Sequence, residues 1–291
     1  TDYTYVSDVV TETTLHYLPN PGKTALKRAF RRVIENKFDH PHNNLLTSSV
    51  IIAEDLINGK SMTDTIQHLS YNANGALTKD LNKGITGIEY DPLGNPRKVT
   101  LTGQRTVEYV YAPDGRRLRA IHRHPVTTVV GRTTVSKQAT TTTDYEGALL
   151  RRNGTPTMCR FPGGYYSFTS AGALDACHYY IQDYLGNNRM VVNRDGTVEQ
   201  VTHYYPYGEL IADISTNPAT QAYKYGDKEL DRTYGLDLYD FEARQYDALV
   251  PSFNSVDPLA EKYYGISPYA YCAGDPVNLV DPTGCEPTGY A

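Results

Sequence analysis

The sequence has no tryptophan, six phenylalanines, three methionines and no long run of apolar residues. A membrane-spanning helix needs about 18 or more consecutive apolar residues, so the sequence predicts no membrane span. No N-terminal signal peptide is visible either. Because the chain begins at Thr1 rather than at a methionine, we expect it to be processed or excised from a longer protein, and the missing signal says little about its location.

Cysteine is also scarce, and its spacing argues against a metal site. None of the cysteines forms the Cys-x-x-Cys pair that is typical of structural zinc sites, and free buried thiols are favoured over disulfides. His40 and His42 flank a proline without a third ligand nearby, so they are interpreted as turn residues. Neither a metal nor a cofactor is predicted. The four cysteines are Cys159, Cys177, Cys272 and Cys285.

An excess of positive charge is missing as well. The chain has 28 basic and 33 acidic side chains and a formal net charge of −5. Domains that bind nucleic acid or anionic membranes usually carry a clear basic patch. The composition therefore gives no general case for either partner, and no nucleic acid is predicted.

The chain is instead rich in tyrosine, with 26 tyrosines beside 23 glycines and 17 prolines. Tyrosine suits a half-buried pleated surface, and glycine and proline favour tight turns. The composition therefore predicts a mainly β protein of many short strands, and its aromatic content argues against disorder. A chain of 291 residues can hold one large domain or two average ones.

The first part of the chain, residues 1–67, carries a helical pattern. From Ala25 to Lys37 apolar residues recur on one face and basic residues occupy the others, which predicts a short basic amphipathic helix. Such a helix either binds an acidic partner or membrane surface or packs with its charges in solvent, and we favour the second interpretation. Ser49–Asn58 is a second apolar segment, helix or strand. The apolar face consists of Leu26, Phe30, Val33 and Ile34.

From about residue 68 a tyrosine-led motif recurs with a period of about 20 residues, which indicates a repeat architecture. Early copies are Tyr71–Gly75, Tyr90–Asn95 and Tyr111–Arg116. Each unit is typical of a hairpin, with Asn-Gly or Asp-Gly at turn positions that need positive φ. Consecutive hairpins predict one antiparallel sheet, whose edges stay exposed unless it curls or continues into neighbouring repeats. Thr133–Thr143 is interpreted as an extended linker between two repeat blocks.

The segment Tyr234–Gly284 is dense in aspartate, tyrosine and proline. It contains three Asp-Pro pairs, and Asp240 and Asp247 precede them with an arginine between. Because the segment has no helical stripe, this cluster indicates a built site rather than a solvated face. The acids are Asp240, Asp247, Asp257, Asp275 and Asp281, and the arginine is Arg244.

These motifs resemble the YD-repeat family, and the last block resembles its RHS repeat-associated core, in the form typical of the Bacteroides group. The resemblance covers residues 68–284. It is carried by Tyr-Asp-Pro-Leu-Gly-Asn at 90–95, Asp-Tyr-Leu-Gly-Asn-Asn-Arg at 183–189, Gly-Thr-Val-Glu-Gln at 196–200, His-Tyr-Tyr-Pro-Tyr-Gly at 203–208, Gly-Asp-Lys-Glu-Leu-Asp at 226–231 and Asp-Pro-Leu-Ala-Glu-Lys-Tyr-Tyr at 257–264.

The resemblance implies a fold and a function. RHS proteins wind hairpin repeats into a hollow β-shell that encloses a variable C-terminal toxin, and their core forms a plug. In many members the core cuts the chain after an Asp-Pro-x-Gly motif. That motif here is Asp281, Pro282, Thr283 and Gly284, which places the predicted cut between Gly284 and Cys285.

The resemblance also implies an aspartyl protease mechanism with Asp247 and Asp257 as the acid pair and Arg244 as their partner. Two close carboxylates do not easily both ionise, so one activates water while the other, protonated, polarises the carbonyl. The alternative is structural, because aspartates open turns and an arginine between acids forms ordinary ion pairs. The sequence departs from the family at Ala248–Ser252, where the usual turn is rebuilt, and at Asp275, which adds a charge.

The sequence thus predicts four regions: 1–67, an N-terminal region with the basic helix; 68–232, the YD-repeat sheet; 233–284, the core plug; and 285–291, a tail. We expect a curved open sheet or partial β-shell. Only seven residues follow Gly284, too few for a toxin, so we expect a truncated form, a fragment or a degenerate copy.

The leading functional prediction is an RHS core module of a secreted polymorphic toxin system, a shell segment and plug that encloses or presents a toxin. Its expected partners are the toxin cargo or the rest of a larger shell, and a secretion-system component or immunity protein. The expected location is secreted or on the bacterial cell surface. The alternative is a non-enzymatic surface protein whose exposed tyrosines bind carbohydrate or partner proteins. A nucleic-acid role for the basic helix is disfavoured by the acidic total.

Overall fold

The chain forms two compact units, Thr1–Lys83 and Gly84–Ala291, which are described separately. Among the described residues, no helix combines the length and the apolar character needed to cross a membrane. The predicted region boundaries at residues 67 and 232 stay predictions. The computed structural model describes residues 2–6, 9–19, 26–39, 45–55, 60–66, 69–130, 133–211 and 214–289.

The first unit contains a five-stranded antiparallel sheet in which each strand pairs with the next. A hairpin that does not belong to this sheet follows it, formed by β6 (Leu69–Tyr71) and β7 (Leu77–Asp80). The Tyr71 hydroxyl donates a hydrogen bond of 2.9 Å to the carbonyl of Leu46, a buried residue of the sheet. The sheet strands are β1 (Asp2–Val6), β2 (Val9–Pro19), β3 (Leu26–Asp39), β4 (Leu45–Asp55) and β5 (Lys60–Ile66).

The helix predicted from Ala25 to Lys37 is wrong, because its described residues from Leu26 onward lie in β3, which pairs with β2 on one edge and β4 on the other. The physical reason lies in the spacing of Leu26, Phe30 and Ile34. A spacing of four brings residues to one face of a helix and is also a multiple of the strand period of two. The second apolar segment is likewise a strand, β4. His40 and His42 lie outside the described residues.

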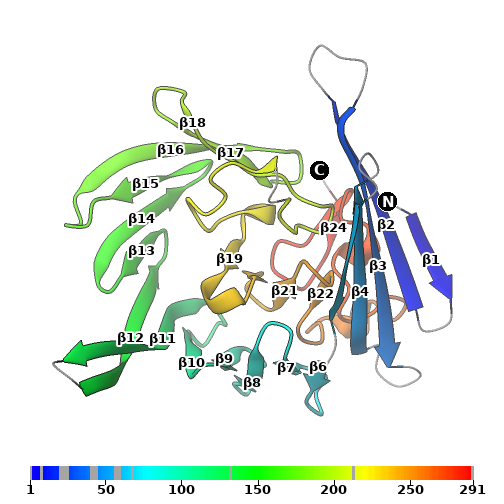
Figure 1. Cartoon of the computed structure of the whole chain (residues 1–291), viewed down its shortest axis with the longest axis horizontal. Coiled ribbons are helices and arrows are strands. Elements are labelled where there is room, and N and C mark those ends of the chain that lie inside the picture. Colours follow the sequence, from blue (N-terminus) through cyan, green and yellow to red (C-terminus); the bar gives the residue numbers. More distant parts are fainter. Residues whose placement is uncertain are drawn as a thin grey trace. The chain divides into compact units, whose positions relative to one another are not determined.

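The second unit contains a long sheet in which successive strands from β8 to β18 are antiparallel neighbours. Figure 1 shows this run as a curved sheet, which confirms the predicted mainly β hairpin architecture. The strands are β8 (Ile85–Tyr90), β9 (Pro96–Leu101), β10 (Arg105–Tyr111), β11 (Arg117–Val130), β12 (Thr133–Glu146), β13 (Leu149–Arg152), β14 (Thr155–Phe161), β15 (Gly164–Phe168), β16 (Leu174–Gln182), β17 (Asn188–Asn193) and β18 (Val198–Val201).

The hairpin turns explain the repeat motif. In the turn between β8 and β9, Asp91 Oδ1 accepts hydrogen bonds of 2.9 Å from the backbone N–H groups of Leu93 and Asn95. Gly94 has a φ of +89° and donates its N–H to the carbonyl of Asp91 at 3.0 Å. Only glycine adopts such a φ without steric cost. The same pattern of side-chain bonds recurs in the turns that begin at Asn72, Asp183 and Asn193.

The segment Thr133–Thr143, interpreted as a linker, belongs to strand β12 instead. It pairs with β11 along most of its length, and the end of β12 pairs with β13. Its extended character was predicted correctly, because threonine and valine favour pleated backbone.

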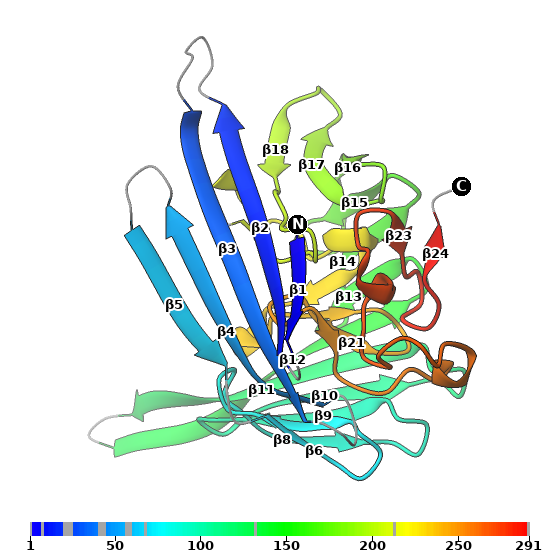
Figure 2. The same ribbon diagram turned by 90° about the vertical axis from the view of Figure 1, so that its right-hand side faces the viewer.

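The C-terminal part of this unit, meaning the residues after β18, lies on the concave side of the curved sheet (Figures 1 and 2). Among its described residues it contains the small sheets β19–β22 and β23–β24 and the short 3₁₀ turns η2 to η5. Polar contacts join it to the long sheet: Arg117 forms ion pairs with Glu229 and Asp240, and His122 Nε2 lies 3.1 Å from Asp231 Oδ2. The strands are β19 (Glu229–Asp231), β20 (Leu238–Asp240), β21 (Gln245–Asp247), β22 (Ser252–Phe253), β23 (Leu279–Val280) and β24 (Thr288–Gly289), and the turns are η2 (Tyr225–Asp227), η3 (Thr233–Gly235), η4 (Ala260–Lys262) and η5 (Cys272–Gly274).

The core of the C-terminal part is built mainly from tyrosine rings. Buried Tyr225, Tyr239 and Tyr246 pack with Phe241 and Phe253. Each of these three hydroxyls donates to a backbone carbonyl at 2.8 or 2.9 Å. Because a buried hydroxyl without a partner is costly, these bonds explain how the fold tolerates tyrosine where phenylalanine is usual.

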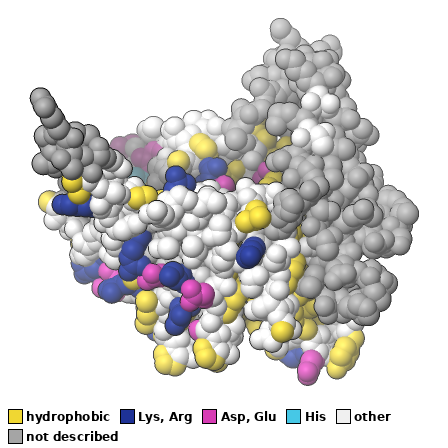
Figure 3. All heavy atoms as spheres, turned by 60° about the horizontal axis from the view of Figure 1, so that its bottom comes forward, with side chains coloured by type: hydrophobic (Ala, Val, Ile, Leu, Met, Phe, Trp, Pro, Cys, Tyr) yellow, Lys and Arg dark blue, Asp and Glu magenta, His cyan; other side chains and the backbone are white. Residues whose placement is uncertain are grey.

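Charged side chains of both signs lie side by side on the face that Figure 3 shows. Ion pairs also join neighbouring strands of the long sheet, such as Arg97 with Glu89 at 3.0 Å and Arg123 with Glu108. A surface of mixed sign is typical of a solvated sheet face rather than of a basic patch.

Candidate cleavage site

Arg244 is the centre of the candidate site. It lies between β20 and β21, is only 2% exposed, and its guanidinium stacks 3.7 Å from the centre of the Phe253 ring. Its Nη1 donates to the carbonyl of Pro268 at 2.8 Å and its Nη2 to Asp257 Oδ2 at 2.9 Å. Its Nε donates to the carbonyl oxygen of Gly284, the carbonyl of the predicted scissile bond. A buried cation thus lies directly on the peptide predicted to be cut.

Two aspartates share this guanidinium. Asp257 lies at 2.9 Å from Arg244 Nη2 and Asp281 at 3.7 Å. Burial raises the pKa of Asp257 and the nearby charge of Asp281 raises it further, against the opposing effects of the Leu259 N–H and of Arg244. A carboxyl group with a raised pKa retains its proton more readily and is suited to act as an acid.

The Asp281 side chain organises the predicted cleavage motif. Its Oδ1 accepts hydrogen bonds from the backbone N–H groups of Thr283 at 3.3 Å, Gly284 at 2.7 Å and Cys285 at 3.1 Å. Asp281 is buried, whereas Pro282 beside it is exposed. One carboxylate oxygen therefore holds the amide N–H on the far side of the predicted scissile bond.

Gly284 is required by close packing and by its backbone conformation. Its φ is +73°, and a Cβ atom there would lie 2.9 Å from the carbonyl oxygen of Phe241 and 3.1 Å from the Phe241 Cβ. Next to it, the Ala243 N–H donates to the carbonyl of Thr283 at 3.1 Å. The motif therefore lies against the Phe241–Arg244 loop, and only glycine fits at the bond.

Asp247, the other predicted acid, is buried at the end of β21. Its Oδ1 accepts a hydrogen bond of 2.9 Å from the Leu249 N–H at the start of the turn toward β22. Along β21, Tyr246 is part of the aromatic core, and successive strand residues point to opposite faces. The acidic partners of Arg244 described above are Asp257 and Asp281, and the catalytic role of Asp247 stays a prediction.

Sequence reasoning assigned Asp281 to the substrate and missed its place beside Arg244 and Asp257. A local signal existed, because an aspartate three residues before a glycine is typical of a turn in which the side chain accepts backbone N–H groups. The approach of Asp281 to Arg244 is a long-range contact, and no sequence period reports it.

A cavity of about 840 Å³ adjoins the predicted scissile bond. Thr283 and Cys285 contribute to its lining, together with Tyr145, Arg117 and Tyr223 from other parts of the second unit. Burial raises the pKa of the half-buried Cys285 thiol, and the charges of Asp257 and Asp281 add to this effect while Arg244 opposes it. The thiol is therefore protonated at neutral pH.

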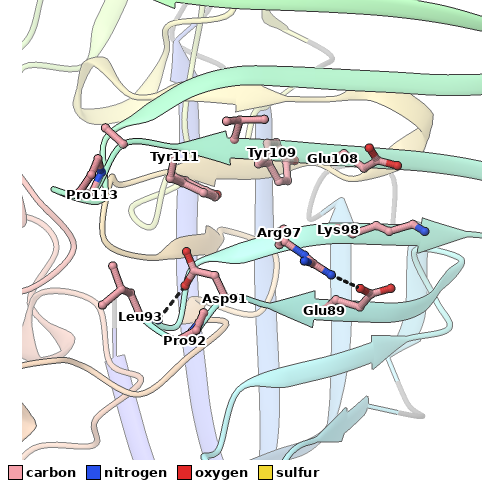
Figure 4. Close-up of a pocket in the computed structure, with 12 residues that line it drawn as sticks. Glu89, Asp91, Pro92, Leu93, Arg97, Lys98, Glu108, Tyr109, Tyr111 and Pro113 are labelled. Atoms are coloured by element: carbon pink, nitrogen blue, oxygen red, sulfur yellow. Dashed lines mark hydrogen bonds and ion pairs between the residues drawn. The ribbon is translucent and has the colours of Figure 1, made fainter.

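A separate groove of about 760 Å³ lies between the hairpins β8–β9 and β10–β11, as Figure 4 shows. Its charged groups are engaged locally: Glu89 pairs with Arg97, and Asp91 accepts hydrogen bonds within its own turn. The groove therefore has the character of a surface valley between neighbouring hairpins.

No group of three or more His, Cys, Asp or Glu side chains with metal-binding geometry occurs among the described residues. All four cysteines are free thiols, as the sequence favoured.

Comparisons with known proteins bear on the fold. No family model matches the chain. The chain is 26% identical over 275 residues to salivary gland surface protein 1 of Aedes aegypti, a match that covers 91% of this chain and 8% of that protein.

Solved structures match nearly the whole chain. The crystal structure of TcdB2-TccC3-TEV gives a TM-score of 0.66 at 19% identity and covers 97% of this chain and 15% of that one. The Photorhabdus luminescens Tc holotoxin pore gives 0.64 at 19%, covering 98% and 15%, and TcdB2-TccC3 gives 0.63 at 19%, covering 97% and 16%. At these identities the similarity is one of fold, and it supports the RHS-like shell fold that the sequence predicted.

Proposed function

We propose that this chain is a shell segment and plug that encloses or presents a C-terminal toxin in a secreted polymorphic toxin system. The support is the fold shared with Tc toxin structures and the packing of the C-terminal part on the concave side of the sheet, held by ion pairs such as those of the half-buried Arg117. The partners are the toxin cargo or the rest of a larger shell, and a secretion-system component or immunity protein. The location is secreted or on the cell surface.

The second part of the proposal is self-cleavage after Gly284. The observation that carries it is the hydrogen bond from buried Arg244 to the Gly284 carbonyl, with Asp257 and Asp281 on the same guanidinium. A fixed cation at this oxygen stabilises the negative charge that develops when the carbonyl is attacked. Asp257 supplies the proton, and the second acid is either Asp247, as the family resemblance implies, or Asp281. One turnover within a covalently positioned chain needs modest rate enhancement.

The test is an intact mass of the full chain carrying a tag beyond Ala291. The expected result is a break between Gly284 and Cys285 that is lost in Asp257→Asn and kept in Asp237→Asn, an exposed acid paired with Arg232. Asp247→Asn and Asp281→Asn identify the second acid. An uncut wild-type chain would refute cleavage while leaving the shell proposal intact. Breaks between Asp281 and Pro282 are excluded from the count, because Asp-Pro bonds break in acid.

A second candidate function is non-enzymatic carbohydrate binding at a surface. Tyr166 and Tyr179 are 40% and 42% exposed on β15 and β16, and both lie near the Phe161 ring, at centroid distances of 5.1 and 6.1 Å. An exposed aromatic platform of this kind marks a binding surface. A glycan-array screen of wild type against a Tyr166→Ala/Tyr179→Ala double variant tests it; binding that disappears in the variant supports the candidate, and no binding by wild type rejects it.

A further inference from the structure

Three polar side chains of the long sheet form a line of hydrogen bonds outside the candidate cleavage site. The Ser167 hydroxyl oxygen of β15 lies 3.0 Å from Nε2 of His178 on β16. Nδ1 of the same ring lies 2.6 Å from Oε2 of Glu199 on β18. His178 is buried, and the other two residues are half-buried. A serine, an imidazole and a carboxylate in this order and at these distances are the arrangement that activates a hydroxyl as a nucleophile.

The pairing of the strands brings these groups together. Strands β15 to β18 are successive neighbours in the long sheet (Figure 1). Tyr165 is the ladder partner of His178, and Ser167 shares the face of Tyr165 because alternate strand residues point the same way. The register of this ladder shifts at Ser167, and a second shift, between β17 and β18, leaves Glu199 as the extra residue of its strand. Such irregularities re-aim side chains and recur next to active sites.

The hydrogen bonds also determine which ring nitrogen carries the proton. A carboxylate only accepts hydrogen bonds, so the proton lies on His178 Nδ1 and the lone pair of Nε2 faces the Ser167 hydroxyl. The Tyr165 ring stacks on the imidazole at a centroid distance of 4.4 Å and an interplanar angle of 15°, which restricts the orientation of the imidazole. Asp175 Oδ2 lies 3.5 Å from the Ser167 oxygen, so His178 is the closer acceptor of its proton.

Ser167 and His178 help to line a second cavity of about 840 Å³, whose walls come from the long sheet and from the C-terminal part. This volume lies in the range of sites for small molecules. Leu150 and Met158 contribute apolar surface to the lining, and Arg152 contributes a positive charge. Apolar walls suit an acyl group, and a cation in the wall favours the negative charge that develops on the acyl oxygen during attack.

We propose that Ser167 and His178 are the catalytic pair of a serine esterase site on the concave side of the long sheet, that Glu199 positions the histidine, and that the site takes small carboxylic esters. Esters are favoured over amides because an alcohol is a better leaving group than an amine. The inference does not depend on the proposed self-cleavage, since the two sites share none of their reacting residues.

The reaction has two steps with balanced atoms and no change of oxidation state. In the first step the bond from Ser167 Oγ to the acyl carbon forms, and the hydroxyl proton passes to His178 Nε2. That proton then moves to the alcohol oxygen as its bond to the acyl carbon breaks. In the second step water attacks the acyl carbon and gives a proton to Nε2, which returns it to Ser167 Oγ as the acyl–serine bond breaks. Glu199 stabilises the imidazolium that forms in each step.

The test combines labelling of the full chain by a biotinylated fluorophosphonate, with peptide mapping, and hydrolysis of p-nitrophenyl acetate. We expect the probe on Ser167, and we expect both activities to be lost in Ser167→Ala and kept in Ser136→Ala, which changes an exposed serine of β12. His178→Ala should lower the hydrolysis rate about 100-fold or more, and added imidazole should restore part of it. Glu199→Gln should lower kcat by a smaller factor and leave KM unchanged.

Three outcomes contradict the inference. One is a wild-type chain that takes up no probe and hydrolyses the ester no faster than Ser167→Ala. Another is labelling that maps to a residue other than Ser167. The third is a loss of activity in His178→Ala that imidazole does not restore, which rejects His178 as the base. The cut after Gly284 is measured separately by intact mass, and we expect Ser167→Ala to leave it unchanged.

Discussion

Two buried cations in the C-terminal part have opposite surroundings. Arg244 donates hydrogen bonds from Nε, Nη1 and Nη2, and two carboxylates, those of Asp257 and Asp281, lie beside its guanidinium. Lys224 is 1% exposed, and among the described residues its Nζ has no hydrogen-bond partner. Burial, with a smaller effect of Arg232, lowers the pKa of Lys224 to about 7. A buried cation is therefore tolerated here either by acidic partners or by loss of its proton.

Replacing Lys224 with methionine is expected to stabilise the protein in a pH-dependent way. The folded pKa of about 7 lies below the ordinary 10.5, so the lysine destabilises the fold fully below pH 7, and this effect fades as the pH rises to 10.5. Each pKa unit corresponds to about 1.4 kcal/mol. Urea unfolding should show a gain of a few kcal/mol at pH 6 that shrinks toward pH 10. The exposed Lys137→Met serves as control, and a gain independent of pH would contradict the prediction.

Gly284→Ala tests the close fit at the predicted bond. Its positive φ and the contact of an added Cβ with the Phe241 carbonyl at 2.9 Å force the motif away from Arg244. We expect a loss of stability of about 1–3 kcal/mol and loss of the cut. Gly289→Ala is the matched control, because a Cβ there meets nothing within 4 Å. Denaturant unfolding measures the stability and intact mass measures the cut. Equal stability and equal cutting of Gly284→Ala and Gly289→Ala would contradict the close packing inferred at Gly284.

At the scale of the element, the hairpin turn is the unit that the chain repeats. A leading aspartate or asparagine accepts backbone N–H groups two and four residues on, and a glycine between them takes positive φ. These bonds join residues within a stretch of five, so the sequence of each turn determines its conformation. The turn in turn sets the register of the two strands that it connects. The long sheet is therefore built from many turns that each form locally and each pair neighbouring strands in the antiparallel way.

Asp91→Ala removes the acceptor from one of these turns. It leaves the N–H groups of Leu93 and Asn95 without their bonds to Oδ1 and breaks a further bond of 2.9 Å from the Asn95 side chain. The expected loss is about 1–3 kcal/mol, since each net hydrogen bond contributes about 0.5–1.5 kcal/mol. Leu93→Ala in the same turn, a 70% exposed residue, should be nearly neutral in thermal unfolding. The prediction fails if Asp91→Ala and Leu93→Ala have the same melting temperature.

At the scale of the whole second unit, half-buried charged side chains join the long sheet to the C-terminal part. Arg117 of β11 pairs with Glu229 of β19 and, at 3.0 Å, with Asp240 of β20. Tyr145 of β12 also donates to Glu229 at 2.9 Å. These contacts link strands about a hundred residues apart in sequence, so they form only when both parts have folded.

Arg117→Leu is expected to lower the free energy of unfolding by weakening the contact between the long sheet and the C-terminal part. It leaves two half-buried carboxylates without their cation, and because solvent screens them in part, the expected loss of about 1–3 kcal/mol lies below that of a fully buried pair. The loss should be largest near pH 7 and smaller at pH 4–5, because burial raises the pKa of Glu229 and a protonated carboxyl needs no cation. Denaturant unfolding at both pH values measures it. Arg116→Leu, an exposed neighbour, is the control, and an equal loss at both pH values would contradict the reasoning.

The sequence by itself determined the hairpins, because the turn bonds at Asp91 and Gly94 join neighbouring residues and leave a readable pattern. It was ambiguous for β3, where the spacing of Leu26, Phe30 and Ile34 satisfies both helix and strand and the pairing with β2 and β4 settles the choice. The family resemblance implied that Arg244 partners Asp257, and only the tertiary structure showed Asp281 beside Arg244 and the Arg244 side chain on the Gly284 carbonyl. Arg244 reaches Gly284 across 40 residues and Asp257 across 13. Such contacts depend on how the folded chain closes its loops, and no local spacing encodes them.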